Sequence, residues 1–323
     1  MRRRDFLRKG TVAAGLAASR GLLERPAGAA ETSKMAPIPK RRLGKTGVDL
    51  SIIALGGIVV MDAEQSHANN IVAEAFDRGI NYFDVAPTYG NAQSRLGPAL
   101  EPYRKRSFLA CKTTERSKDG SAKELDESLR LLRTDHVDLY QFHAVTTKED
   151  VEKIFGPAGA METFQAARQA GKVRFIGFSA HSVENALSML DHYNFDTILF
   201  PINFVLFSQA NFGPQIIAKA RERGMGILAL KGMAKTTWPA AEKKNHPSPK
   251  CWYEPASLPD EAALALRWTL SHPITAAVPP GDEAYFRLAM DVAQSFKPIE
   301  PGEEKTLMAG AQGLEPLFHL AKA

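Results

Sequence analysis

The stretch from residue 81 to residue 90 holds two side chains that could do chemistry. Asp84 lies inside a short apolar run, and Tyr89 follows just after the proline that ends this run. A buried carboxylate costs several kcal/mol unless a cation or hydrogen-bond donors compensate it. Asp84 therefore requires a cation, and Lys112 and His143 stand at the ends of two later apolar runs.

A tyrosine, a lysine, an aspartate and a histidine can together deliver a proton to a carbonyl oxygen while a hydride reaches its carbon. Isolated tyrosine titrates at about 10, which is too high for free proton exchange at neutral pH. A lysine ammonium within about 4–6 Å stabilises tyrosinate and lowers this pKa. In this interpretation Asp84 keeps Lys112 charged and oriented, while His143 donates to the developing oxyanion or helps Tyr89 relay its proton. None of the four side chains supplies a hydride, so the interpretation requires a nicotinamide.

Each of these residues also has an ordinary structural explanation. A tyrosine before a glycine in a turn commonly packs, and a histidine at a strand end is commonly structural. Asp84 and Lys112 alone could form a buried ion pair with no chemical role. Their joint occurrence at successive strand ends favours the chemical interpretation.

Positioning four such side chains requires strands whose ends meet, and the chain alternates between strand and helix patterns throughout. Residues 121–124 also fit a capping box, with Ser121 and Glu124 at its two ends. We expect strands at residues 51–55, 81–86, 108–112, 137–142, 173–178, 197–200, 226–230 and 275–278. We expect helices at residues 67–78, 94–103, 121–132, 160–169, 183–190, 216–223, 260–270 and 283–295.

Eight strand–helix pairs in a chain of this length favour a closed (β/α)8 TIM barrel over an open doubly wound sheet. No GxGxxG follows the first strand, which also argues against an open dinucleotide-binding sheet. Residues 42–47 predict an N-terminal hairpin, and a long loop follows the seventh strand. Chemistry in such barrels lies at the C-terminal strand ends, where neighbouring strands are about 4.8 Å apart. The alternation of side chains along a strand turns Cys111 away from Lys112, toward the helices.

The composition, 44% hydrophobic and 24% charged over 323 residues, is that of a globular protein. The formal charge of +5 resides in residues 1–29, which hold seven basic and two acidic residues. The remainder is neutral and lacks the basic surface expected for nucleic-acid binding. Cys111 and Cys251 are the only cysteines, so neither an iron–sulfur cluster nor a cysteine-rich zinc site is supported. We predict no metal site and no disulfide.

The leader begins with the pair Arg3-Arg4, followed by a Phe-Leu pair, a weakly apolar stretch at residues 10–23 and a small-residue end at 27–29. This pattern resembles a twin-arginine export signal. It implies a signal peptide at 1–30, a linker at 31–41, a barrel at 42–323, contact with the export machinery and a periplasmic or otherwise exported protein. A disordered basic tail or an uncleaved anchor is the alternative. Arg20 interrupts the apolar stretch, which falls short of the roughly 20 residues of a spanning helix, so we expect no stable membrane anchor.

The residues Asp84, Tyr89, Lys112 and His143, together with the strand–helix alternation and the opening at residues 43–47, resemble the aldo-keto reductase family. The resemblance extends over about residues 42 to 296. It implies a barrel that binds NADP(H) in an extended form and reduces a carbonyl compound or oxidises an alcohol. By this match the four residues form the catalytic tetrad.

The same resemblance assigns cofactor contacts to the strand ends, where the match is weaker. Ala180 replaces the asparagine of the family's Ser-Asn clamp, Leu199 replaces a glutamine, and the stacking tyrosine of the seventh strand is missing. The family's lysine is absent at Gly281, and Lys231 is a candidate to replace it. Arg287 matches the arginine that holds the 2′-phosphate, and the alternative for both charges is a solvated surface residue. The predicted cofactor-binding residues are Gly56, Gly57, Ser179, Asn203, Lys231, Gly281 and Arg287.

A long insertion at residues 233–257 carries aromatic residues among prolines and lysines. A loop of this length in a compact barrel is usually functional or disordered. We expect either a lid whose aromatic side chains stack on a sugar or another ring, or a loop that these side chains simply anchor. The predicted substrate-side residues are Ile58, Trp238, Trp252 and Tyr253.

Two functions follow from the sequence. The first is an exported NADP(H)-dependent oxidoreductase that acts on a small carbonyl, hydroxyl or sugar-like molecule, with Tyr89 as general acid and base. The second is a cofactor-binding sensor or partner-binding module with little turnover, which the weaker cofactor match motivates. Lyase or isomerase chemistry is disfavoured, because the predicted strand ends carry no metal cluster and no paired carboxylates.

Overall fold

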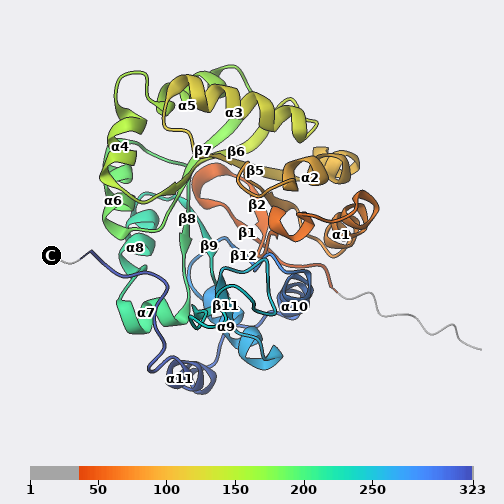
Figure 1. Cartoon of the computed structure of the whole chain (residues 1–323), viewed down its shortest axis with the longest axis vertical. Helices are drawn as coiled ribbons and strands as arrows, with labels where there is room; N and C mark the ends of the chain where they lie inside the picture. The colour runs from red at the N-terminus through yellow and green to blue at the C-terminus, as the bar shows by residue number, and fades with distance from the viewer. Residues whose placement is uncertain (1–35, 322–323) are drawn as a thin grey trace, which may run out of the picture. The chain divides into compact units, whose positions relative to one another are not determined.

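A computed structural model of the chain describes residues 36–321. The predicted export signal and residues 31–35 of the predicted linker lie outside the described residues. Eight parallel strands, each near the centre of Figure 1, form a single sheet. They are β3 (Leu55–Gly56), β4 (Tyr82–Asp84), β5 (Phe108–Thr113), β6 (Val137–Val145), β7 (Val173–Ala180), β8 (Thr197–Pro201), β9 (Gly226–Leu230) and β12 (Ala276–Val278).

The sheet runs in the order β12-β9-β8-β7-β6-β5-β4-β3, so neighbours in space follow one another along the chain. The two end strands also meet, because Ile53, just before β3, pairs in parallel with Ala277 of β12. The backbone N–H of Ala54 donates to the carbonyl of Ala277, and that of Ala277 donates to Ile52, each at 2.9 Å. The predicted closed (β/α)8 barrel is confirmed.

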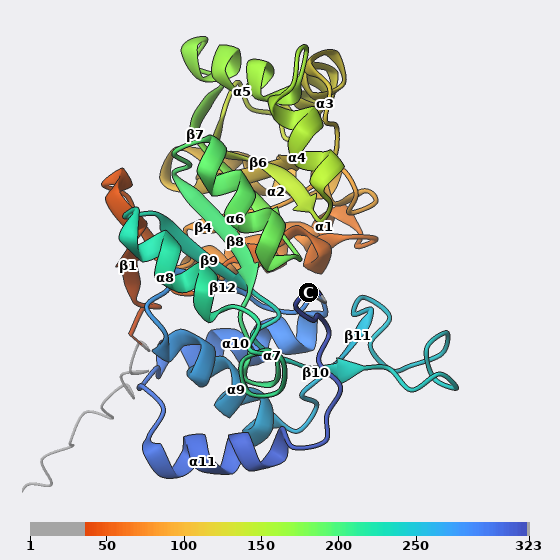
Figure 2. The ribbon, with the colours of Figure 1, turned by 90° about the vertical axis from the view of Figure 1, so that its left-hand side faces the viewer.

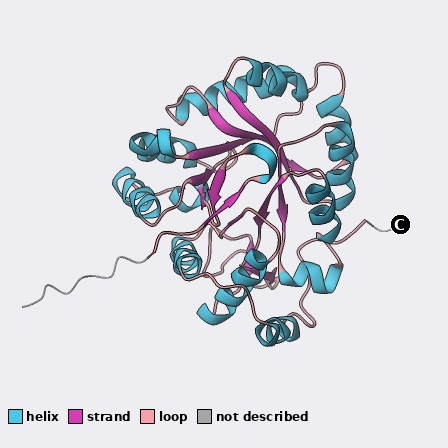
Figure 3. Ribbon diagram, turned by 180° about the vertical axis from the view of Figure 1, so that it is seen from behind, coloured by secondary structure: helices cyan, strands magenta, loops and turns pink. Residues whose placement is uncertain are grey.

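Helices surround the strands (Figure 3) and bury their apolar faces against them. Three of these helices, α4, α7 and α11, are not among the predicted elements. The helices are α1 (Gln65–Asp77), α2 (Ala92–Leu100), α3 (Lys118–Leu131), α4 (Lys148–Phe155), α5 (Ala160–Gln169), α6 (Val183–His192), α7 (Phe204–Ala210), α8 (Pro214–Glu222), α9 (Pro259–Ser271), α10 (Glu283–Gln294) and α11 (Pro301–Gly310).

The predicted N-terminal hairpin closes the N-terminal end of the barrel. Strands β1 (Lys40–Arg42) and β2 (Asp49–Ser51) pair antiparallel, so the last two residues of the predicted linker belong to the hairpin. Leu43 and Leu50 are fully buried in the cluster that fills the barrel interior. Because the hairpin fills this end, the C-terminal strand ends form the open mouth.

The long insertion after β9 contains a second hairpin, made of β10 (Ala234–Thr237) and β11 (Tyr253–Pro255). Figure 2 shows the loop between these strands projecting away from the barrel. Near its return, the Lys250 ammonium donates to the carbonyls of Val59, at 3.0 Å, and Met61, at 2.8 Å. The insertion is thereby tied to the segment that follows β3. Within residues 36–321, no helix combines the length and the apolar character needed to cross a bilayer.

Candidate active site

The predicted ion pair between Asp84 and Lys112 is confirmed. Asp84 is the last residue of β4, Lys112 lies on the neighbouring β5, and both side chains are buried. The Lys112 ammonium contacts the Asp84 carboxylate and also donates to the carbonyl of Val85 at 3.2 Å. Burial alone would lower the pKa of Lys112, but the negative charge of Asp84 and the neighbouring Tyr89 raise this pKa above its ordinary value. The ammonium therefore stays charged.

Two further donors, absent from the predicted site, hold the same carboxylate. The Tyr82 hydroxyl donates to Asp84 Oδ2 at 3.1 Å, and Gln141 Nε2 donates to it at 3.3 Å. Tyr82 stands two residues before Asp84, so the alternation of side chains along the strand already placed both on one face. Gln141 pairs in register with Lys112 across β5 and β6. These donors compensate the burial of the carboxylate and fix its orientation.

Tyr89 lies in the loop after β4, beside Lys112 and His143. The Lys112 ammonium is 5.1 Å from the centre of the tyrosine ring, and the His143 ring meets that ring edge-on at 5.7 Å. Burial raises the pKa of Tyr89 by more than the ammonium of Lys112 lowers it, so the net shift is upward. Lys112 does lower the pKa of Tyr89, as predicted, but burial outweighs this effect. The predicted net decrease of the pKa is therefore wrong. The phenol is therefore protonated at neutral pH and ready to donate.

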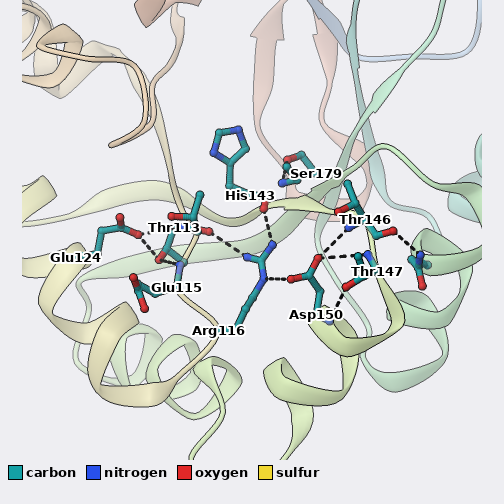
Figure 4. A network of polar contacts seen from close by, with 12 residues as sticks. Thr113, Glu115, Arg116, Glu124, His143, Thr146, Thr147, Asp150 and Ser179 are labelled. Carbon is teal, nitrogen blue, oxygen red and sulfur yellow. Dashed lines mark hydrogen bonds and ion pairs between the residues drawn. The ribbon is translucent and has the colours of Figure 1, made fainter. Parts of the chain in front are cut away.

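His143 stands near the end of β6 at a backbone irregularity, since the next residue, Ala144, has a φ of 52°. Figure 4 shows how neighbouring side chains hold this segment. Arg116 donates to the carbonyl of His143 at 2.7 Å and to Asp150 at 2.9 Å. The Ser179 hydroxyl accepts from the N–H of Ala144 at 2.8 Å. The imidazole is thus positioned through its backbone from two sides.

Two imidazoles at the mouth are neutral at neutral pH. Burial, followed by the charge of Lys112, lowers the pKa of His143 to about 3. Burial, followed by the charge of Lys231, lowers the pKa of His181 to about 4. His143 therefore favours hydrogen-bond donation to an oxyanion over release of a proton. His181 was not among the predicted site residues, although it directly follows β7, much as His143 lies near the end of β6.

The four predicted tetrad residues line one cavity of about 210 Å³ at the mouth of the barrel. Its walls combine the strand ends with the insertion that follows β9. Among the other predicted site residues, the structure places Ile58, Ser179, Lys231, Gly281, Trp252 and Tyr253 in this lining. The lining also includes residues that were not among the predicted site residues, namely His181, Leu199, Leu230, Lys250, Val278, Pro279 and Pro280.

Gly281 lacks the expected lysine for a steric reason. A Cβ atom at this position would lie 2.3 Å from the side chain of Ile58, so Ile58 occupies the space that a side chain would need. The cavity instead receives an ammonium from Lys231 on the neighbouring strand end. The sequence shows that residue 281 is not a lysine, but it does not show that the Ile58 side chain fills the space there.

Three of the predicted cofactor residues do not line the cavity. Asn203 caps α7 by accepting from the N–H of Leu206 at 2.8 Å, and it donates to the carbonyl of Lys231 at 3.2 Å. Gly56 and Gly57 allow close packing instead, since a Cβ would come within 3.1 Å and 2.7 Å of neighbouring valine side chains, respectively. These residues support the mouth but do not face its interior.

Arg287 and Trp238 also lie outside the cavity lining. Arg287, on α10, pairs with Glu283 at 2.9 Å and with Glu74 at 2.5 Å, and 45% of its side chain is exposed. The Trp238 ring stacks on His246 at 4.2 Å, and its indole N–H donates to the carbonyl of Cys251 at 2.9 Å. Trp238 therefore anchors the insertion, which was one of the two roles expected for its aromatic side chains.

Both cysteines are buried and unpaired with each other, as expected. Cys111 turns toward the helices and accepts a hydrogen bond from Gln93 of α2 at 3.3 Å. Among the described residues, no group of three or more His, Cys, Asp or Glu side chains is arranged to hold a metal ion.

The chain is similar to known proteins. Residues 53–289 match the model of the aldo/keto reductase family. L-galactose dehydrogenase of Arabidopsis thaliana is 28% identical over 226 residues, which cover 62% of this chain and 67% of that protein. The uncharacterized oxidoreductase YqkF of Bacillus subtilis is 32% identical over 155 residues, which cover 44% of this chain and 48% of that protein. The matched region thus spans about half to two thirds of the length of these relatives.

The fold has solved counterparts as well. The holo form of aldo-keto reductase AKR11C1 from Bacillus halodurans superimposes with a TM-score of 0.67 at 20% identity. The superposition covers 88% of this chain and all of that one. Because the family model covers well over half of the chain and the fold agrees, the protein belongs to the aldo/keto reductase family.

Proposed function

We propose that the protein transfers a hydride between NADP(H) and a small carbonyl or hydroxyl compound, with Tyr89 as the proton donor and acceptor. The observation that carries this proposal is the protonated phenol of Tyr89 beside the Lys112 ammonium and the neutral His143, at the wall of one cavity. The test is oxidation of NADPH by the purified protein with a panel of aldehydes, ketones and sugars. A Tyr89 variant, discussed below, links any turnover to this site.

The cavity lining fits a nicotinamide. Leu199, Leu230 and Val278 provide an apolar floor, and Leu230 stands where a stacking tyrosine was expected. The hydroxyl of Ser179 accepts from the backbone of Ala144, which leaves its own proton free to donate to a carboxamide. A bound nicotinamide supplies the hydride that no side chain can supply.

The side chains of the site then account for the proton. In the direction of reduction, the O–H bond of Tyr89 breaks as its proton passes to the carbonyl oxygen, and a tyrosinate remains. The Lys112 ammonium stabilises this tyrosinate, and Asp84 keeps the ammonium oriented. His143, neutral and held through its backbone, donates a hydrogen bond to the developing oxyanion. In the direction of oxidation the tyrosinate takes the proton back.

We further propose that the substrate is sugar-like. Trp252 and Tyr253 bring two aromatic rings to the cavity, which offer large and rigid apolar contact area. One relative of the chain is named for its action on L-galactose. The alternative of a cofactor sensor without turnover is not favoured, because the tetrad is assembled and the chain belongs to an oxidoreductase family.

The preference for NADP(H) over NAD(H) rests on Arg287. Its guanidinium is half-exposed, and its present partners are the carboxylates of Glu74 and Glu283. We expect Arg287→Gln to weaken NADPH binding roughly tenfold to a hundredfold, because a hydrogen bond to a charged group contributes about 1.5–3 kcal/mol. The affinity for NADH, which lacks the 2′-phosphate, should not change. Fluorescence titration of both dinucleotides measures these dissociation constants.

Arg130→Gln is the matched control, since Arg130 lies on α3 and pairs with an exposed glutamate in the same way. It should leave both affinities unchanged. Equal weakening of NADPH and NADH binding by Arg287→Gln would instead mean that Arg287 acts through the packing of α10, and the NADP(H) assignment would lose its support.

We also propose that the protein is exported through the twin-arginine route, on the strength of Arg3 and Arg4 in the leader. Changing both to lysine in the full chain should strongly reduce the exported, processed protein and leave precursor in the cytoplasm. Cell fractionation and immunoblotting in a bacterium that has this route measure the two forms. Arg8→Lys, outside the pair, is the control, and undiminished export of the double variant contradicts the proposal.

A further inference from the structure

Lys231 is a cation of the cavity that has no oxygen partner among the described residues. Its ammonium lies 5.0 Å from the centre of the Trp252 ring and 4.6 Å from that of Tyr253. Such cation–π contacts hold an ammonium but leave its N–H groups without acceptors. Asp84 is the one carboxylate in the cavity lining, and Lys112 already pairs with it.

The other lysines of the lining are engaged. Lys112 contacts Asp84 and the Val85 carbonyl, and Lys250 donates to two backbone carbonyls. Lys231 differs from both because the contacts of its ammonium among the described residues are with the rings of Trp252 and Tyr253 and with no oxygen atom. The chemistry that would satisfy it is an oxyanion brought by a ligand.

The backbone of Lys231 is fixed in an unusual conformation. Its φ of 68° lies in the left-handed region, which a residue with a side chain rarely adopts. Its carbonyl accepts from Asn203 Nδ2 at 3.2 Å and from the N–H of Ala234 at 2.8 Å. Strain held in place by its surroundings is typical of functional positions. Here the fixed backbone sets the direction of the Lys231 side chain, whose ammonium contacts the rings of Trp252 and Tyr253.

The ammonium also belongs to the cavity in which the reaction is proposed to occur. Lys231 and the four tetrad residues line the same cavity. The charge of Lys231 contributes to the lowered pKa values of both His143 and His181. Burial lowers the pKa of Lys231 itself to about 8, so most of it is charged at neutral pH. An oxyanion bound there would be part of the molecule that faces His143.

We propose that Lys231 binds an oxyanion group of the substrate, so that the enzyme acts on acidic carbonyl or hydroxyl compounds such as sugar acids or sugar phosphates. This inference rests on the proposed function and gives its substrate class. In this proposal Lys231 contacts the substrate, whereas the family resemblance implied that it contacts the cofactor. Trp252 and Tyr253 orient the ammonium and offer their faces to the rest of the substrate.

The first test compares matched substrates that differ in one acid group. D-glucuronate and D-glucose test a carboxylate, and glyceraldehyde 3-phosphate and glyceraldehyde test a phosphate. Wild-type kcat/KM should be higher for the acidic member of at least one pair. Lys231→Gln should lower that value about tenfold to a hundredfold, since a charge-assisted hydrogen bond is lost. The value for the neutral member should change less than about threefold, and Lys231→Arg should recover part of the loss.

Lys231→Asn serves as a second variant, because asparagine tolerates the left-handed backbone well. Lys118→Gln, a surface lysine that pairs with Glu162, controls for the loss of one positive charge. The pair that shows discrimination identifies the oxyanion as carboxylate or phosphate. An equal loss on acidic and neutral members, in both Lys231→Gln and Lys231→Asn, overturns the inference.

A second measurement does not depend on turnover. Acetate or inorganic phosphate should raise the unfolding temperature of the NADP⁺-saturated protein above that in sodium chloride of equal ionic strength. Lys231→Gln should abolish this increase. If the anions instead compete with NADP⁺ and Lys231→Gln weakens NADP⁺ binding, the ammonium serves the cofactor and the inference is wrong. If the wild type reduces none of the carbonyls, the proposed function fails, while the anion measurement still decides the role of Lys231.

Discussion

Tyr89→Phe should lower kcat for NADPH-dependent carbonyl reduction by about 10²–10⁴-fold, the range that general acid catalysis contributes. The variant removes only the hydroxyl, so the ring should still pack beside Lys112 and His143. The proton that the carbonyl oxygen requires then has no donor within the tetrad. Steady-state kinetics on the best substrate of the panel measures the loss, and fluorescence titration should show NADPH affinity within about threefold of wild type.

Tyr140→Phe is the matched control for this result. Tyr140 is buried on β6, packs against Phe164 at 4.5 Å, and its hydroxyl has no hydrogen-bond partner among the described residues. Loss of that hydroxyl should leave kcat unchanged. If Tyr89→Phe and Tyr140→Phe both retain wild-type turnover, the proton comes from another group and the proposed mechanism is wrong.

Lys112→Met should destabilise the fold by about 3–5 kcal/mol, the usual cost of leaving one member of a buried ion pair without its partner. The Asp84 carboxylate would keep only the hydrogen bonds from Tyr82 and Gln141. Adding Asp84→Asn should recover a large part of the loss, because the unpaired charge is then gone. Chemical denaturation of the wild type, both single variants and the double variant gives the coupling free energy of the pair.

The control for this double-mutant cycle is a solvent-exposed ion pair, Arg130 with Glu127. Arg130→Met breaks the contact with Glu127 on the surface of α3 and should leave the midpoint of denaturation unchanged. Catalysis should remain low in the double variant despite its recovered stability, since nothing then stabilises the tyrosinate of Tyr89. If the double variant is as unstable as Lys112→Met, the cost lies in packing and not in the charge.

The barrel and the tetrad could be predicted from the sequence because both depend on local patterns. Buried parallel strands carry apolar residues on both faces, and a polar side chain at a strand end stands out against them. Asp84, Lys112 and His143 were recognisable in this way, and the register of β4, β5 and β6 brings their strand ends together. Tyr82, inside the same apolar run, gave no such contrast, although its spacing from Asp84 contained the information.

The N-terminal ends of α3 and α4 show that a local sequence motif can be compatible with more than one hydrogen-bonding arrangement. Ser121 and Glu124 have the spacing of a capping box, but α3 begins at Lys118 with Ser117 as its cap. Glu124 instead accepts a hydrogen bond from the Thr113 hydroxyl, which Figure 4 shows. It accepts another from the N–H of Thr114. A real capping box joins Thr147 and Asp150 at the start of α4, a helix absent from the prediction. The sequence motif alone does not tell which tertiary partner a carboxylate will take.

The direction of the pKa shift of Tyr89 could not be predicted from the sequence either. The ammonium of Lys112 and the burial of the ring act in opposite directions, and their balance depends on how closely the mouth is covered. Three residues of the insertion at residues 233–257, Lys250, Trp252 and Tyr253, line the same cavity as Tyr89. The sequence of this insertion does not indicate which of its residues reach the cavity. For the same reason the sequence could not separate Trp238, which anchors the insertion, from Trp252 and Tyr253, which line the cavity.

The two hydrogen bonds between Lys250 and the segment after β3 depend on one side chain. Val59 and Met61 take part through main-chain oxygens, which persist whatever side chain stands at those positions. Substitution of Val59 or Met61 therefore leaves both acceptors in place, whereas substitution of Lys250 removes the donor of both hydrogen bonds. The attachment of the insertion can thus be altered, by evolution or by design, without changing a residue of the tetrad.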